Sequence, residues 1–318
     1  MELKMYYNLD DKQRFTATLE SYNADHGEPG GRTVADFANN RDQNLLENDR
    51  VRLDRLFASV GYELGEDDAK WITKAWASDV VRYSKRQTGQ GFGTVTGNQL
   101  DINQHTYHTV GIDSRVRYDY DLAEETQTLT FGTTYMDIYA PIFLERTAAG
   151  DLTSNRGVTR RNQAIRESRY GALFAENLFR YDRFTFTPAI RLEYNNQVMN
   201  EQINVNKAPG NLIDDSRTEV VPLAGLGMTY EVADKTELYG NVSQSYKPPT
   251  YTDAFPLGGA DTISENLDAG ELLNYEIGFR GQPVSWATFD ASLFYIDYDG
   301  RFGRVSKTSD ARSIKALA

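Results

Sequence analysis

The stretch Phe184-Thr185-Phe186-Thr187-Pro188-Ala189-Ile190-Arg191-Leu192-Glu193-Tyr194 decides the fold class. Every second side chain in it is apolar, and the side chains between these are Thr, Ala, Arg and Glu. A period of two places alternate side chains on opposite faces of a β-strand. This strand therefore presents one face to an apolar environment and the other face to water.

The same alternation recurs along the chain in segments that come in pairs. Many of these segments are about ten residues long or longer, whereas strands of soluble sheets average about five to six. About ten residues is the length that a tilted strand needs to cross a bilayer. We therefore predict an all-β fold, an antiparallel transmembrane β-barrel rather than a soluble sandwich or propeller, with about twelve strands. They cover residues 2–9, 13–23, 51–64, 69–84, 107–121, 126–140, 165–179, 184–196, 218–232, 236–247, 271–281 and 286–299.

The connections between these strands alternate strictly between short and long. Within a pair the connector is a short run of turn formers, such as Asp10-Asp11-Lys12 or Tyr181-Asp182-Arg183. Between pairs we expect roughly 20 to 27 residues rich in Gly, Asn, Asp and Pro, longer than compact domains usually allow without a functional reason. In bacterial outer-membrane barrels, short turns lie on the periplasmic side and long loops face outward. Aromatic residues near the strand ends, such as Trp71 and Tyr230, fit interfacial girdles.

The composition excludes several classes of protein. The 318 residues include no cysteine, which excludes thiolate metal sites and disulfides, and the net charge of −12 argues against a nucleic-acid partner. The mean hydropathy is −0.58, and no apolar run is long enough for a membrane-spanning helix. A barrel also has a low mean hydropathy, because its lumen and loops are polar. No Gly-x-Ser-x-Gly, phosphate-loop or His-Glu-x-x-His motif occurs, so we expect no enzyme, with an outer-membrane hydrolase as the alternative.

Two ordered motifs resemble a known family. Residues 238–251 read Leu-Tyr-Gly-Asn-Val-Ser-Gln-Ser-Tyr-Lys-Pro-Pro-Thr-Tyr, and residues 274–280 read Asn-Tyr-Glu-Ile-Gly-Phe-Arg. Their order and spacing are similar to those of TonB-dependent outer-membrane receptors. Upstream, residues 29–37, 111–115 and 186–193 look closest to the ferric dicitrate receptor group within that family.

This resemblance implies a Gram-negative outer-membrane receptor in the lipid bilayer that takes up a ferric siderophore or ferric dicitrate. It implies a barrel of about 22 strands filled by an N-terminal plug, with energy delivered by TonB-ExbB-ExbD through a TonB box. Residues 1–318 contain neither plug nor TonB box and end after about twelve strands, so we expect a partial barrel domain. No resident cofactor is expected, because the Fe(III) chelate is cargo. A passive porin-like barrel is the alternative.

The resemblance also suggests ligand-binding residues. An anionic chelate calls for arginine, whose planar guanidinium can form two hydrogen bonds to a carboxylate. Arg82 aligns with a ligand-facing arginine of the dicitrate receptor group. A second such arginine falls at His105, and a third falls at Asn162, beside Arg160 and Arg161. We predict Arg82, Arg160, Arg161 and His105 as ligand-binding residues. The alternative for Arg82 is a salt bridge at a loop base or in the lumen, and the alternative for Arg160 and Arg161 is a solvated loop.

Neither metal-binding nor catalytic residues are predicted. His105 and His108 are three residues apart, so on a strand they lie on opposite faces, and we do not expect a two-histidine metal site there. The identity of the chelate stays open, because catecholate and hydroxamate siderophores also use pockets rich in aromatic residues. The aromatic residues that could line such a pocket are Tyr107, Tyr135, Tyr139, Phe143, Tyr246 and Tyr251.

Overall fold

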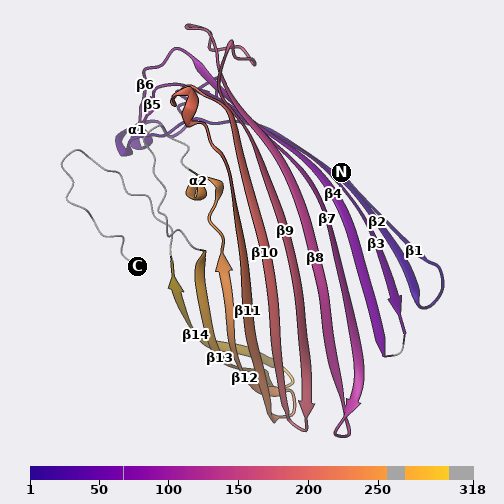
Figure 1. Cartoon of the computed structure of the whole chain (residues 1–318). Coiled ribbons are helices and arrows are strands. Elements are labelled where there is room, and N and C mark those ends of the chain that lie inside the picture. The colour runs from indigo at the N-terminus through magenta and orange to yellow at the C-terminus, as the bar shows by residue number, and fades with distance from the viewer. Residues whose placement is uncertain (67, 256–268, 301–318) are drawn as a thin grey trace.

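A computed structural model describes residues 1–66, 68–255 and 269–300 of the chain. These residues form one sheet of 12 strands and a separate hairpin of two short strands. The strands of the large sheet follow chain order and pair antiparallel throughout (Figure 1). They are β1 (Glu2–Asn8), β2 (Gln13–Gly27), β3 (Arg50–Gly65), β4 (Ala69–Gln87), β7 (Leu100–Leu122), β8 (Glu125–Arg146), β9 (Thr159–Tyr181), β10 (Phe184–Asn204), β11 (Asp214–Ala233), β12 (Thr236–Lys247), β13 (Gly270–Val284) and β14 (Ala287–Asp299).

The remaining elements lie among the long connections. The hairpin consists of β5 (Gln90–Gly91) and β6 (Thr94–Val95), and the short helices are α1 (Val34–Asn39), η1 (Pro209–Asn211) and α2 (Tyr251–Ala254). No helix among the described residues is both long enough and apolar enough to cross a membrane. The predicted antiparallel all-β fold with twelve long strands is confirmed.

The sheet is a curved wall with the short turns at one end and the long loops at the other (Figure 1). Within the described residues, β1 and β14 form its two edges and do not pair with each other. Tight turns close the hairpins: Ala123 and Glu124 both have positive φ, at 57° and 65°, and join β7 to β8. Two consecutive positive φ angles match the twist of the flanking strands, which is why such turns are favoured in hairpins.

The two faces of the sheet differ as the alternation predicts. On β10, Ile190 and Leu192 expose 67% and 46% of their surface on what we call the apolar face. Arg191 and Glu193 lie on the opposite, polar face and bind each other there. Because successive side chains of a strand point to opposite faces, this assignment extends to the neighbouring strands through the pairing register.

An aromatic girdle borders the apolar face near the short turns. Phe15 packs on Tyr62 at 4.9 Å between ring centroids, and Tyr62 packs on Trp71 at 5.6 Å. Farther along the sheet, Phe179 stacks on Phe186 at 4.7 Å. This is the place where a girdle at a membrane interface was predicted from the sequence.

A row of charged side chains borders the apolar face on the loop side. Its members include Asp54, paired with Arg52 at 2.6 Å, Asp79, paired with His108 at 2.8 Å, and Asp137, paired with Arg169 at 3.4 Å. We call the region between this charged row and the aromatic girdle the apolar belt. On β10 the belt runs over residues 184–194, about the length of one bilayer crossing.

Several strands extend farther toward the loops than predicted. β7 begins at Leu100 rather than at residue 107, and β9 begins at Thr159 rather than at residue 165. The long connections at 147–158 and 205–213 are therefore shorter than the expected range. Beyond the charged row apolar and polar side chains no longer alternate strictly, as in Ala140-Pro141-Ile142-Phe143-Leu144, although backbone pairing continues.

A small core lies at the loop end, where the loops fold back on the strands. Ala164, Met199, Ile213 and Phe255 form a buried cluster, and Tyr251 packs against it. Beside it, Glu201 and Lys207 form an ion pair whose side chains are 0% and 5% exposed. This core fixes the loop of residues 205–213 and helix α2 against the wall.

Candidate functional site

Arg82 and His105 meet on the polar face, where β4 pairs with β7. They are direct partners in the register of these strands. Val110 of β7 pairs with Asp137, a residue of the charged row. His105 lies farther toward the loops than Val110, so Arg82 and His105 lie outside the apolar belt. Among the described residues, Arg82 has no hydrogen-bond or ion-pair partner. Its guanidinium is therefore available to a ligand.

Arg166 on β9 joins this pair from two strands away. One of its Nη atoms lies 3.4 Å from Nδ1 of His105. Its guanidinium carbon lies 5.8 Å from the ring centroid of Tyr107 and 5.2 Å from that of Tyr251. Its Nε is buried and has no hydrogen-bond partner. Two aromatic rings thus hold Arg166 in place, and its Nε–H group has no acceptor. A buried donor without an acceptor destabilises the fold unless a ligand accepts its hydrogen bond.

His105 is uncharged in this surrounding. Burial, together with the positive charges of Arg166 and Arg82, lowers the pKa of His105 from 6.5 to about 4. At neutral pH its imidazole therefore contributes hydrogen bonding and no charge. The positive charge of the site comes from its arginines.

Arg161 lies on the same side as His105. Both residues line a cavity of about 200 Å³ together with Asn103 and Asn162. The backbone carbonyl of Arg161 accepts a hydrogen bond from the amide of Val205 at 3.0 Å, which ties the residue to the loop of residues 205–213. We refer to Arg82, Arg161 and Arg166, grouped around His105, as the arginine cluster.

Arg160 is not part of this cluster. Its guanidinium binds Glu145 at 2.7 Å and lies 4.3 Å from the ring centroid of Phe143. The register of β8 and β9 shifts between Leu144 and Glu145, which turns Arg160 away from the position that strict alternation assigns to it. Its predicted role in ligand binding stays a prediction, and its guanidinium already has a carboxylate partner.

The structure therefore brings together three of the four residues predicted from the sequence, Arg82, His105 and Arg161, and adds Arg166. Alternation along β9 places Arg166 on the polar face and could have indicated its side. Its proximity to His105 depends on the registers of two successive strand pairs, which the sequence does not specify.

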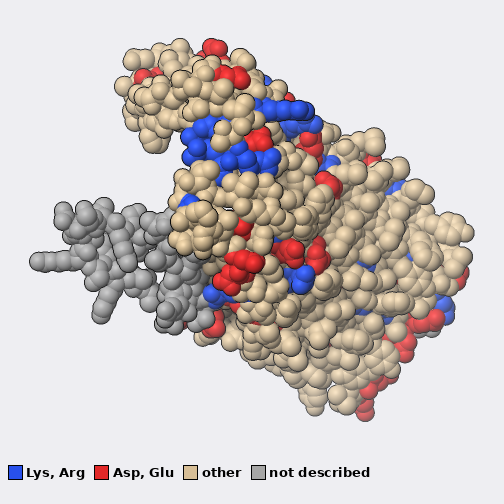
Figure 2. Space-filling view, turned by 45° about the horizontal axis from the view of Figure 1, so that its top comes forward, with Lys and Arg blue, Asp and Glu red and all other residues tan. Residues whose placement is uncertain are grey.

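The charge of the loop end is visible on the surface. Figure 2, in which the loop ends of the strands are turned forward, shows a patch of Lys and Arg side chains, with a group of Asp and Glu side chains below it. Among the described residues, no group of three or more His, Asp or Glu is placed to hold a metal ion. His108 lies on the apolar face, where it pairs with Asp79 at 2.8 Å, so His105 and His108 point to opposite sides as predicted.

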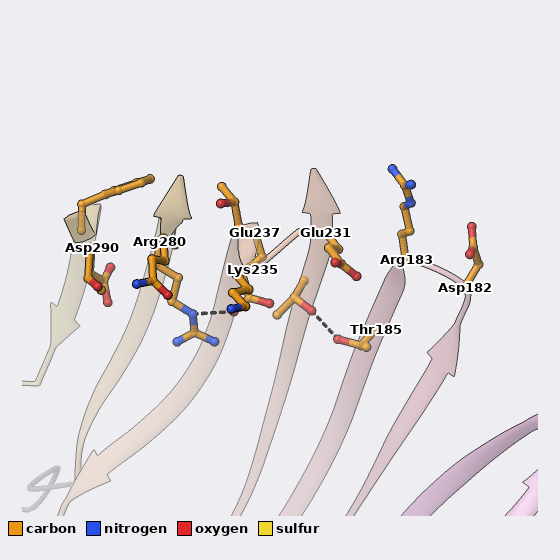
Figure 3. Close-up of a pocket in the computed structure, with 14 residues that line it drawn as sticks. Asp182, Arg183, Thr185, Glu231, Lys235, Glu237, Arg280 and Asp290 are labelled. Atoms are coloured by element: carbon orange, nitrogen blue, oxygen red, sulfur yellow. Dashed lines mark hydrogen bonds and ion pairs between the residues drawn. The ribbon is translucent and has the colours of Figure 1, made fainter. Parts of the chain in front are cut away.

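A larger cavity of about 660 Å³ lies at the opposite end of the wall, beside the short turns. Figure 3 shows acidic and basic side chains following one another across its strands, with Arg280 bound to Glu237. Asp290 accepts a hydrogen bond from the hydroxyl of Tyr239 at 3.0 Å. The charges of this cavity are of mixed sign, so it lacks the uniformly positive charge of the arginine cluster.

Comparisons with known proteins agree with the fold. The family model "TonB dependent receptor-like, beta-barrel" matches residues 4–314. The ferric citrate transporter FecA in its unliganded form superimposes with a TM-score of 0.80 at 21% identity, over 93% of this chain and 42% of that chain. The ferric-catecholate import receptor Fiu from E. coli K12 gives 0.71 at 13% identity, over 94% and 52%. The ferric yersiniabactin uptake receptor FyuA from Yersinia pestis gives 0.64 at 16% identity, over 93% and 44%.

The solved structures share the architecture of this chain but differ in the chelate that their names give. At these identities the likeness shows the fold alone, and the chain spans 42% of the length of the FecA structure. The family model, in contrast, covers residues 4–314. The chain therefore belongs to the TonB dependent receptor-like β-barrel family, whose barrels lie in the outer membrane of Gram-negative bacteria.

Proposed function

We propose that this chain forms the ligand-binding wall of an outer-membrane receptor that takes up an anionic ferric chelate through the arginine cluster. In such a barrel the apolar face meets lipid and the polar face lines the lumen. The cluster lies on the lumenal side beyond the lipid-facing belt, near the loops, where a ligand from outside arrives first.

The observation that supports this most strongly is the uncompensated positive charge of the cluster. Elsewhere on the polar face, arginines bind carboxylates, as Arg191 binds Glu193 and Arg217 binds Glu219. Among the described residues, the guanidinium groups of Arg82, Arg161 and Arg166 contact no carboxylate. Like charges held close together repel, so an anion that bridges them is stabilised in that position.

The chemistry of the cluster suits a chelate with several oxygen donors. Guanidinium groups bind carboxylates and other oxyanions through paired, charge-assisted hydrogen bonds. Neutral His105 can donate or accept one further hydrogen bond, and Tyr107 and Tyr251 add aromatic surface beside Arg166. The iron stays within its chelate, so the protein supplies no metal ligand and carries out no covalent chemistry.

Energy for uptake would come from TonB-ExbB-ExbD, as in the family to which the chain belongs. The alternative, a passive porin-like barrel, would let a chelate diffuse through without a high-affinity site. The two differ in a simple observation, because uptake by a receptor saturates at low chelate concentration and stops when TonB is removed.

The test measures binding of ferric dicitrate to the protein in outer-membrane vesicles and uptake of the same radioactive chelate by cells. Arg82→Ala removes a charge-assisted hydrogen bond of about 1.5–3 kcal/mol, which corresponds to roughly 10- to 150-fold weaker binding. Arg169→Ala is the matched control, because it removes an arginine of the charged row on the opposite face.

Three outcomes separate the possibilities. Weaker binding by Arg82→Ala alone, with TonB-dependent uptake, supports the proposal. The proposal fails if both variants bind each chelate as tightly as the wild type does. The chelates tested are ferric dicitrate, a ferric catecholate and a ferric hydroxamate, and equal affinities for all three would show that the arginine cluster is not the binding site. Uptake that neither saturates nor needs TonB would favour the porin-like alternative.

A further inference from the structure

The apolar belt has a gap on β12, at Gly240. Gly240 lies on the apolar face and pairs with Met228 of β11 on one side and with Ile277 of β13 on the other. Met228 in turn pairs with Phe186, which stacks on Phe179. Each of these neighbours in the row carries a large side chain, so the missing side chain of Gly240 leaves an open space in the belt.

This space is a groove of about 550 Å³. Its lining is mainly apolar and aromatic, and the six such side chains nearest to Gly240 in the register expose between 39% and 78% of their surface, so little protein covers them. Leu238 and Val242 flank Gly240 along β12, and the groove continues over β13 toward β14. These six side chains are Met228, Leu238, Val242, Tyr275, Ile277 and Leu293.

The backbone does not require glycine at this position. Gly240 is not among the residues with positive φ. A Cβ built on it would lie 3.7 Å from the backbone oxygen of Glu276, which is an ordinary van der Waals contact. Glycine weakens the interior of a strand and often marks a site where a ligand approaches the backbone closely. A ligand in the groove accounts for a glycine that neither conformation nor packing demands.

The surroundings of the groove indicate what that ligand is. The groove is continuous with the lipid-facing belt and lies next to the girdle at the short-turn end, where Phe279 packs on Phe289 at 5.0 Å. Short turns face the periplasm in this class of barrel, so the groove lies at the depth of the periplasmic leaflet. Its walls match the chemistry of a hydrocarbon chain.

We propose that the groove at Gly240 binds one acyl chain of a phospholipid from the periplasmic leaflet. The hydrophobic effect does not drive this contact, because the acyl chain leaves one hydrocarbon environment for another. The gain comes from dispersion, since an unfilled gap forfeits the contacts of its lining and a seated chain restores them. The bound chain is therefore held longer than the lipids that surround the rest of the belt.

The test uses the protein in phospholipid nanodiscs with a lipid that carries a photoreactive diazirine in the middle of its acyl chain. After irradiation, mass spectrometry locates the labelled residues. We expect several-fold more label on Met228 and Ile277 than on Phe131, a belt residue on β8. Gly240→Leu fills the groove and should lower the label on Met228 and Ile277 to the level of Phe131.

Two further variants keep the result interpretable. Gly171→Leu is the matched control, because Gly171 also lies on the apolar face, between Tyr135 and Tyr194, with no atom within 4 Å of a built Cβ. It should leave the label at Met228 unchanged. Gly240→Ala fits the backbone and should reduce the label only partly, which covers the case in which Gly240→Leu fails to fold.

The proposal is overturned by label spread evenly over the belt, or by label at Met228 that Gly240→Leu and Gly240→Ala leave unchanged.

Discussion

Glu201 holds the loop core together, and removing its charge should release the loop of residues 205–213. Its carboxylate accepts hydrogen bonds from Lys207 Nζ at 2.8 Å, from Asn204 Nδ2 at 2.7 Å and from the amide of Ile213 at 3.0 Å. The side chains of Glu201 and Lys207 are 0% and 5% exposed. Glu201→Gln keeps the shape of the side chain but removes the negative charge that pairs with the buried ammonium of Lys207.

Breaking a buried ion pair by neutralising one partner costs about 3–5 kcal/mol. Because the pair ties the loop of residues 205–213 to the end of β10, we expect the cost to appear as local opening of that loop rather than as loss of the barrel wall. Each 1.36 kcal/mol changes an equilibrium about tenfold, so the open population should rise by roughly two to four orders of magnitude.

Trypsin measures this opening directly, because it cleaves after Lys207 only when the loop opens. When opening and closing are fast relative to cleavage, the cleavage rate follows the population of the open form. Cleavage after Lys235, in the exposed turn between β11 and β12, is the internal control and should not change. The double variant Glu201→Leu with Lys207→Met should protect the loop again, because an apolar pair can replace a buried ion pair. Trypsin cannot cut after residue 207 in this variant, so protection is measured by hydrogen exchange of residues 205–213.

Equal cleavage after Lys207 in Glu201→Gln and in the wild type would refute this reasoning. Faster cleavage would also indicate a change near the arginine cluster, because Ile213 packs in the cluster that holds Phe255 and Tyr251. Loosening that cluster frees Tyr251 from Arg166 and should weaken binding of the chelate as well.

Two further predictions concern single side chains of the loop end. Because the pKa of His105 is lowered from 6.5 to about 4, the folded state loses stability as the pH falls from 6.5 toward 4; His105→Gln should flatten this part of the melting temperature against pH, and an unchanged slope would contradict the assignment. Arg160→Ala should alter affinity for an anionic chelate much less than Arg161→Ala, because Arg160 already binds Glu145; binding titrations that show the larger loss for Arg160 would reverse this order.

Most of the fold could be predicted from the sequence because alternation and turn residues carry the information. The alternation of residues 184–194 predicts the face of each side chain, and Ile190 and Arg191 lie on the faces expected. The strand ends near the loops could not be predicted in the same way. Strict alternation arises only where one face of the strand meets an apolar environment and the other meets water. Beyond the charged row that environment ends, while β7 continues to Leu100.

The site could be predicted only in part, because proximity across strands depends on register. Arg82 and His105 were both proposed from the sequence, and they are direct partners. Arg166 reaches His105 across β8, and this requires the registers of two strand pairs. The shift between Leu144 and Glu145 then reverses the side of Arg160, and a single irregularity of this kind has no reliable signal in one sequence.

The central claim is that an anionic ferric chelate binds at the arginine cluster, and the anomalous scattering of iron tests it most directly. Crystals of the protein soaked with ferric dicitrate, measured at the iron absorption edge, should show one iron peak on the polar face between β4, β7 and β9. The chelate oxygens should lie within hydrogen-bond distance of Arg82 and Arg166. An iron peak elsewhere, for example in the cavity beside the short turns, or electron density for a chelate that contacts neither arginine, would contradict the account.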